Sequence, residues 1–230
     1  IKGSLKILQK LCREVKPSKV YICWDGREGS SKRRKTIKEY KEGRKPIRLN
    51  RGIRNLSEEQ ELQNKIWQQL RLAEYINNMP VSQIMIDYTE ADDVIAALCN
   101  FHKEDNKVIV SSDKDFFQLL DDTTVLYRPV QKEVMNKNRV TDKFLIHPSN
   151  FALARAIAGD KSDNLPGVGG AGLKTIAKKF PDMCGEETYT IKRLLSDCEK
   201  VENKLKIHNA IIEKKELIEK NYKIMQLYTP

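Results

Sequence analysis

The chain has 230 residues, of which 40% are hydrophobic and 32% charged, a composition typical of a globular protein with a sizeable interior. No apolar run approaches the roughly 20 residues of a membrane-spanning helix, so we expect no membrane partner. The formal net charge of +10 favours an anionic partner, and we weigh a nucleic acid above a membrane surface or a genomic bias toward Lys.

Strands and helices alternate in the first half of the chain. An amphipathic helix over 4–16 precedes a short apolar strand, VYICW, over 20–24, which ends at Asp25. Residues 27–54 then hold twelve Lys or Arg against three Glu, with few core-forming residues. This composition indicates an exposed basic insertion.

The alternation resumes after the insertion. Ser57 is placed to cap a helix over 57–77, and the chain reads as helical after Pro148, with a glycine-rich break at 167–172. Between these helical regions we expect strands over 83–86, 107–112 and 124–128, and helices over 91–100 and 116–120. This order predicts an α/β fold with a parallel sheet covered by helices on both faces.

Cysteine and histidine usage limits the chemistry. The chain has three His at no ligand-like spacing, and its five Cys form no CxxC pair. The cysteines therefore indicate reduced thiols of a cytosolic protein. Any bound metal should be a hard cation held by oxygen ligands.

An acidic cluster stands out in this basic chain. The stretch TEADDVIAALC places Glu90, Asp92 and Asp93 directly before an apolar run. Helix capping explains part of it, with Thr89 as N-cap and Asp92 as the returning acid of a capping box. Capping does not explain why similar acids recur elsewhere in the sequence.

The recurring acids follow predicted strands. Asp25 ends one strand, Asp113 and Asp115 follow another, and GDKSDN adds Asp160 and Asp163 before a glycine turn. The carboxyl ends of parallel strands meet at one sheet edge, where so many carboxylates would repel one another unless cations neutralised them. Two Mg²⁺ or Mn²⁺ ions, roughly 3.5–4 Å apart, would satisfy this edge and are the usual arrangement for cleaving a phosphodiester.

Two basic features could hold the polyanion. The turn in NLPGVGGAGLKTIAKKF offers backbone N–H groups at a helix start; no strand precedes it, which disfavours a dinucleotide-binding loop. In the insertion, Arg33, Lys41 and Arg44 could grip phosphates while Tyr40 stacks on a base, although a solvated basic loop is an equal alternative.

With these motifs in hand, the chain resembles the 5′-nuclease family, which includes phage and bacterial flap endonucleases, 5′–3′ exonucleases and the 5′-nuclease domain of bacterial DNA polymerase I. The resemblance rests on VYICWDG, EYKEGRK, MPVSQIMIDYTEADDVIAAL, IVSSDKDFFQLL and GDKSDNLPGVGGAGLKTIAKKF, in that order. It implies a mostly parallel central sheet flanked by helices, a PIN-like core, with a basic helical arch and a helix–hairpin–helix lobe. Residues 1–147 would form the core, with the arch at 27–54, and residues 148–230 the helix–hairpin–helix region and C-terminal helices.

The resemblance also implies roles for individual residues. Lys41 would contact the scissile phosphate region, assisted by Arg44 and by Arg33, or by Arg34 with a one-residue shift. The implied metal ligands are Asp25, Glu90, Asp92, Asp93, Asp113, Asp115, Asp160 and Asp163. The implied duplex-binding residues, where the family often holds a K⁺ ion through backbone carbonyls, are Gly167, Val168, Gly169, Gly170, Gly172, Lys174, Thr175, Lys178 and Lys179.

The implied activity is that of a divalent-metal-dependent, structure-specific 5′-nuclease. Its substrate would be duplex DNA with a 5′ single-stranded end or flap, or an RNA–DNA primer hybrid, during replication or repair in a bacterial or phage-infected cytoplasm. We expect a monomer. Alternatives are a PIN-like ribonuclease, disfavoured by the glycine turn, and a non-catalytic junction-binding protein on the same scaffold.

One expected motif is missing. Family members begin with a strand of the type L-I-D-G, whose Asp also binds metal, and this chain enters at what looks like the following helix. We therefore expect the sequence to begin within a longer protein, and its end at LYTP to be premature as well. The missing acid is the best support for the non-catalytic alternative.

Overall fold

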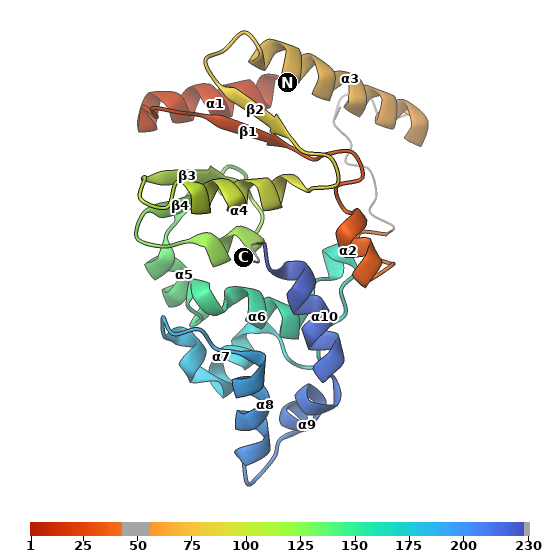
Figure 1. Cartoon of the computed structure of the whole chain (residues 1–230), viewed down its shortest axis with the longest axis vertical. Helices are drawn as coiled ribbons and strands as arrows, with labels where there is room; N and C mark the ends of the chain where they lie inside the picture. The colour runs from red at the N-terminus through yellow and green to blue at the C-terminus, as the bar shows by residue number, and fades with distance from the viewer. Residues whose placement is uncertain (43–55, 228–230) are drawn as a thin grey trace.

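A computed structural model describes residues 1–42 and 56–227, and its elements form an elongated molecule with the N-terminal layer at one end and the helices over 191–213 at the other (Figure 1). The N-terminal layer agrees with the sequence-based prediction. Ser57 closes a capping box with Gln60, which fixes the start of its longest helix. The layer consists of α1 (Lys2–Val15), β1 (Tyr21–Trp24), α3 (Glu58–Ile76) and β2 (Ser82–Met85).

The middle layer contains two elements that were not predicted, β5 and α5. A side-chain cap from Asn136 to the N–H of Arg139 starts α5. The FFQLL segment forms a 3₁₀ helix, η1, in place of the expected α-helix. The layer consists of α4 (Ala91–Phe101), β3 (Lys107–Val110), η1 (Asp115–Leu119), β4 (Thr124–Arg128), β5 (Glu133–Met135) and α5 (Lys137–Phe144).

The C-terminal third is helical, as expected. Pro148 occupies the first turn of α6, where its missing N–H costs nothing, and Gly159 ends this helix with a φ of 76°. The elements are α6 (Pro148–Ala158), η2 (Lys161–Asp163), α7 (Leu173–Lys179), η3 (Pro181–Cys184), α8 (Ile191–Lys200), α9 (Lys206–Glu213) and α10 (Lys215–Met225).

The strands form two small sheets instead of one continuous sheet. β1 and β2 pair in parallel, with Tyr21 opposite Ser82, and β3 and β4 pair in parallel, with Lys107 opposite Thr124. β5 adds to β4 in the antiparallel direction. The expectation of one parallel sheet is thus corrected: in the described ranges, no ladder joins β1 or β2 to β3. The alternation of strands and helices predicted each parallel pair, but periodicity carries no information on which pairs join.

The main hydrophobic core is built from the sheet of β3, β4 and β5 and from the C-terminal helices. Phe117 is fully buried and meets Phe151 edge-to-face with a ring-centroid distance of 5.2 Å. The same cluster runs from Ala96 to Leu227, so it crosses the predicted boundary at 147/148, and the proposed division stays a prediction. The described helices include none that is both long and apolar enough to cross a membrane.

The described part of the basic insertion, residues 27–42, contains a short helix, and we call this part the arch base. α2 (Ser31–Thr36) was not predicted, and it lies beside α10 (Figure 1). Two hydrogen bonds tie the segment after α2 to the turn after α6: the backbone N–H of Lys41 donates to the carbonyl of Asp163 over 3.0 Å, and the side-chain amide of Asn164 donates to the carbonyl of Glu39 over 3.1 Å. The rest of the arch falls within 43–55, outside the described residues.

We expect the Phe117→Ala substitution to lower the free energy of unfolding by about 3–5 kcal/mol, because it removes a large ring from a filled core. Urea unfolding would measure the loss. Phe101→Ala is the matched control, because Phe101 is 81% exposed, and it should change the free energy of unfolding by less than about 0.5 kcal/mol. Equal losses in the two variants would contradict this assignment of the core.

Candidate active site

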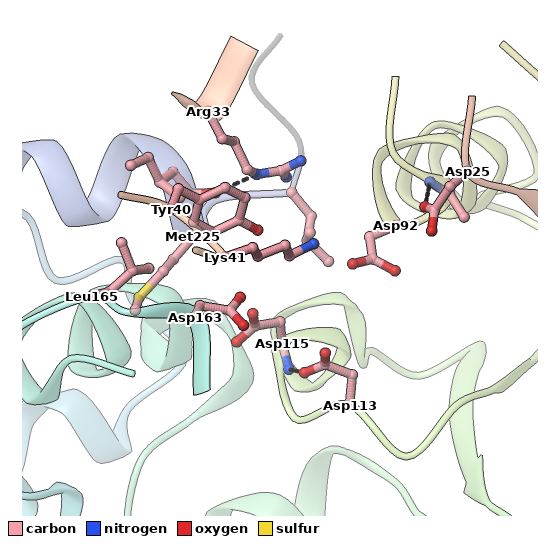
Figure 2. Close-up of a pocket in the computed structure, with 13 residues that line it drawn as sticks. Asp25, Arg33, Tyr40, Lys41, Asp92, Asp113, Asp115, Asp163, Leu165 and Met225 are labelled. Carbon is pink, nitrogen blue, oxygen red and sulfur yellow. Dashed lines mark hydrogen bonds between the residues drawn. The ribbon is translucent and has the colours of Figure 1, made fainter. Parts of the chain in front are cut away.

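An acidic pocket of about 190 Å³ opens at the carboxyl ends of β1 and β3 (Figure 2). Four segments supply five aspartates that the sequence separates widely, and basic and apolar side chains complete the lining. The acidic lining is Asp25, Asp92, Asp113, Asp115 and Asp163, and the rest includes Arg33, Tyr40, Lys41, Leu165, Ile224, Met225 and Leu227. The strands belong to two sheets and not to one edge, but five of the eight predicted acids meet at this pocket.

Backbone turns hold two of these aspartates in place. Asp25 leaves β1 and accepts a hydrogen bond of 2.9 Å from the N–H of Ala91, the first residue of α4. This corrects the capping expectation. The N-cap residue of α4 is Glu90, whose side chain makes no capping bond, and Asp25, not Thr89, accepts the hydrogen bond from the first N–H of the helix. After β3, Asp113 accepts from the N–H of Asp115 over 2.9 Å, which folds the DKD turn toward the pocket.

The surroundings of the pocket disfavour the charged form of two of its aspartates, Asp92 and Asp115. Burial raises the pKa of Asp92 to about 7, the charges of Asp113, Glu90 and Asp25 add to this rise, and Lys41 opposes it. Burial likewise raises the pKa of Asp115 to about 6, although the Arg155 guanidinium opposes it. Carboxylates held at such a cost mark a functional site more often than a structural one.

The donor set fits a hard divalent cation. The acidic lining offers carboxylate oxygens, which Mg²⁺ and Mn²⁺ prefer, and no His or Cys lines the pocket. Within residues 1–42 and 56–227, however, no three acidic, His or Cys side chains lie close enough together to form a finished metal site. The acids surround the pocket, and a cation would have to draw them inward.

Two predicted ligands, Glu90 and Asp93, are held by cations of the arch base. Arg33 binds both oxygens of Asp93, each over 2.7 Å, and also donates to Glu90. Lys41 donates to the other oxygen of Glu90 over 2.6 Å. Glu90 is 4% exposed and does not line the pocket. These two acids therefore serve as anchors for the arch base in this structure.

Of the alternatives Arg33 and Arg34, the structure brings Arg33 into the site. Its Nε donates to the carbonyl of Ile224 on α10 over 2.9 Å, and its side chain is 10% exposed, whereas Arg34 is exposed. The guanidinium thus joins α2, α4 and α10. Arg44 lies outside the described residues.

Tyr40 is buried in this structure, whereas the sequence analysis expected its ring to be free to stack on a base. The residue is 4% exposed and packs with Leu165, Ile224 and Met225, and its hydroxyl donates to Glu90 over 3.4 Å. Burial and the Glu90 charge raise the pKa of the phenol. The apolar partners come from distant parts of the chain, so the local sequence gave no sign that the ring would be covered.

Lys41 is the cation nearest to the centre of the pocket. Its backbone is left-handed, with a φ of 57°, and its N–H is bonded to the Asp163 carbonyl, so the residue is fixed at both ends. Figure 2 shows the side chain reaching toward Asp92 from the side of Tyr40. The predicted phosphate-binding Lys therefore faces the acids across the pocket.

Arg155 was missed by sequence reasoning. It projects from α6 and bridges Asp115 over 3.0 Å and Asp160 over 2.5 Å. Burial would lower its pKa, but the two carboxylates outweigh burial and raise it. The signal was present, because Arg155 is the single charge within the apolar stretch FALARAIAG.

The predicted helix–hairpin–helix forms around α6, η2 and α7. A Cβ on Gly167 would lie 2.1 Å from the carbonyl oxygen of Ala158, so only Gly allows the hairpin to pack on the end of α6. Val168 is buried beneath it. Around Gly169, Gly170 and Gly172 the space is open. The exposed side chains that follow are those of Lys174, Lys178 and Lys179, with Thr175 half-buried.

The C-terminal helix closes the back of the pocket. Gln118 of η1 donates to the carbonyl of Met225 over 3.0 Å and accepts from the N–H of Leu227 over 3.1 Å. No motif in the sequence pointed to this contribution. The apolar wall follows from tertiary packing alone.

Comparison with known proteins places the chain among nucleases. Residues 1–145 match the family described as 5′-3′ exonuclease, N-terminal resolvase-like domain. The chain is 30% identical to a 5′-3′ exonuclease of Aquifex aeolicus, an alignment that covers 100% of this chain and 71% of that protein. It is 29% identical to the flap endonuclease Xni of Shewanella putrefaciens, with 96% of this chain and 76% of that protein covered.

Solved structures share the fold. A 5′-exonuclease of bacteriophage T5 with bound divalent metal ions (zinc) superposes with a TM-score of 0.78 at 20% identity, covering 98% of this chain and 80% of that one. The T5 D15 flap endonuclease in a complex with DNA and metal ions gives the same values. The predicted family, fold class and nuclease activity are thus confirmed: this chain belongs to the 5′-3′ exonuclease family.

Proposed function

We propose that the chain hydrolyses phosphodiesters near junctions between duplex and single-stranded DNA, as a divalent-metal-dependent 5′-nuclease that acts on 5′ ends or flaps. The observation that carries the proposal is the acidic pocket faced by Lys41. Five aspartates, two with raised pKa values, lie opposite a cation fixed at the arch base. Acids suit a metal and the cation suits a phosphate, so both halves of a nuclease site are present.

The metal would be Mg²⁺ or Mn²⁺, as two ions held by the pocket-lining aspartates. Bound there, the metal would supply an activated water and stabilise the leaving oxygen. The remaining predicted ligands, Glu90, Asp93 and Asp160, are engaged by Arg33, Lys41 and Arg155. We propose that these three acids orient the Arg and Lys side chains of the site in the metal-free protein. To bind a metal ion, each acid would have to leave its Arg or Lys partner.

Lys41 would bind the phosphate next to the bond that breaks. In this structure its ammonium spends one hydrogen bond on Glu90 and also lies 5.0 Å from the centre of the Tyr40 ring. A phosphate oxygen offers the same charge-assisted bond. DNA binding would therefore replace the Glu90 contact with a phosphate contact and leave Arg33 to hold the arch base.

The helix–hairpin–helix would hold duplex DNA through its backbone. The open glycines let a phosphate approach closely, and the exposed lysines after them add charge. A K⁺ ion on the hairpin carbonyls, an RNA–DNA primer hybrid as a second substrate, a monomeric state, and a cytoplasmic role in replication or repair complete the proposal. The glycine hairpin disfavours a PIN-like ribonuclease.

The Asp92→Asn substitution should abolish cleavage of a 5′-flap duplex while leaving its binding largely intact, because the change removes a candidate ligand and one negative charge. We expect a loss of at least about a hundredfold in the rate with Mg²⁺, larger than the loss typical of residues that only support a ligand. A single-turnover assay on end-labelled DNA, with Mg²⁺ or EDTA, would measure it.

Asp142→Asn is the matched control, because Asp142 is exposed on α5 and the charge change is the same. It should keep the rate of the unaltered protein. Binding without any Mg²⁺-dependent product in the unaltered protein would favour the non-catalytic junction-binding alternative. Full cleavage by Asp92→Asn would overturn the metal assignment.

The Arg155→Met substitution should destabilise the metal-free protein by about 2–3 kcal/mol, because it leaves Asp115 and Asp160 half-buried without their shared cation. Urea unfolding in EDTA would measure the loss, and Mg²⁺ should reduce it. Arg71→Met removes an ion pair whose Arg side chain is 52% exposed, and should cost less than about 0.5 kcal/mol. A wild-type unfolding midpoint for Arg155→Met in EDTA would show that Arg155 does not balance these acids.

A further inference from the structure

A second hollow lies on the other side of the arch base from the acidic pocket. It has a volume of about 570 Å³ and is formed by the segment 36–39, the turn after η2 and one face of α10. Leu165 lines both hollows, and the segment 36–41 forms a wall of each. We call this second hollow the lysine groove, because Lys38, Lys161 and Lys220 line it.

The charge of the lysine groove is opposite to that of the acidic pocket. Its three lysines are exposed, and none of them forms an ion pair with another described residue. The one acid in the lining is Glu39. Unpaired cations around a concave surface attract a polyanion, and they release its counterions when it binds.

Apolar side chains lie beside the lysines of the groove, so the lining can contact bases as well as phosphates. Ile37, Leu165, Pro166 and Leu217 lie among the lysines. Proteins that hold a single strand combine a positively charged groove along the backbone with aromatic side chains that stack on the bases, and of these two features the lysine groove offers the charge, with aliphatic contacts beside it. The volume of about 570 Å³ falls within the roughly 300–1,000 Å³ of pockets that hold a small ligand, which is room for a short single-stranded stretch.

The walls of the lysine groove are fixed to one another. The Asn164 amide bonds to the Glu39 carbonyl over 3.1 Å, and this joins the arch base to the turn after η2. On α10, Asn221 donates to the carbonyl of Pro166 over 2.8 Å and to that of Ala156 over 3.0 Å. The groove is therefore a built feature of the fold.

From these observations we infer that the lysine groove binds the sugar–phosphate backbone of the single-stranded 5′ arm that continues past the acidic pocket. This inference rests on the proposed function for the identity of the arm. The segment 36–41 presents Lys41 to the acidic pocket and Lys38 to the lysine groove, so one strand can contact both faces of it in sequence.

The test compares two DNA duplexes that differ only in a 5′ single-stranded arm of ~10 nucleotides, a length within the range that single-strand sites cover. Dissociation constants are measured by fluorescence anisotropy in EDTA, and again with Ca²⁺, over a series of salt concentrations. The variant is K38Q/K161Q/K220Q. The matched control, K6Q/K65Q/K200Q, removes the same charge from exposed lysines on α1, α3 and α8.

We expect the unaltered protein and the control to bind the armed duplex at least about tenfold more tightly than the unarmed one. The groove variant should lose this preference, and its affinity for the unarmed duplex should fall no further than that of the control. The slope of log K against log salt for armed DNA should become shallower by about 2, since each of three phosphate contacts to a single strand contributes about 0.7. Equal arm preference in the groove variant and the control would overturn the inference, as would no preference in the unaltered protein.

Failure of the proposed function has a different result. If the unaltered protein never cleaves flap DNA with Mg²⁺ but its arm preference depends on the three lysines, the groove stands and the nuclease proposal falls. If cleavage occurs and the groove variant keeps the arm preference, the nuclease proposal stands and the groove inference falls. Circular dichroism of each variant would show that the exposed substitutions leave the fold unchanged.

Discussion

The structure depends on how eight carboxylates are tolerated in one small region. Three of them, Glu90, Asp93 and Asp160, are neutralised by arginine or lysine side chains that the chain itself brings in. The others line the pocket with less compensation, and burial raises the pKa of Asp92 and Asp115 toward neutrality. A folded protein that leaves such groups uncompensated forgoes stability at that spot, and a divalent cation would restore the balance.

The internal cations also explain why distant segments meet at this pocket. Arg33 comes from the basic insertion, yet it binds acids of α4 and a carbonyl of α10. Arg155 comes from α6 and joins the turn after β3 to the start of η2. Each arginine has several donors in a rigid fork, so one side chain can fix two or three elements at once. The acids thereby bring α4, the turn after β3, the C-terminal helices and the arch base together around one pocket.

Sequence reasoning located the acids because strand ends and chain direction are local properties. Asp25 and the Asp113–Asp115 pair follow short apolar strands, and the structure brings both to the pocket. The same reasoning left Tyr40 exposed and overlooked Arg155, because Glu90, which binds the Tyr40 hydroxyl, is 50 residues away, and Asp115, which binds Arg155, is 40 residues away. The division of the strands into two sheets was missed for a related reason, since periodicity shows that a segment is a strand without showing its neighbour.

The segment 36–41 separates the acidic pocket from the lysine groove and contributes residues to both. Its first four residues, 36–39, line the lysine groove, and its last two, Tyr40 and Lys41, line the acidic pocket. A positively charged wall between an acidic hollow and a basic one creates a steep change of potential over a short distance. Under the two proposals, a polyanion would enter the acidic hollow only where a metal has reversed its sign, whereas the basic hollow would attract it without metal. Binding and cleavage would then have different requirements in the same few residues, with the lysines retaining a strand and the metal-loaded acids deciding where it is cut.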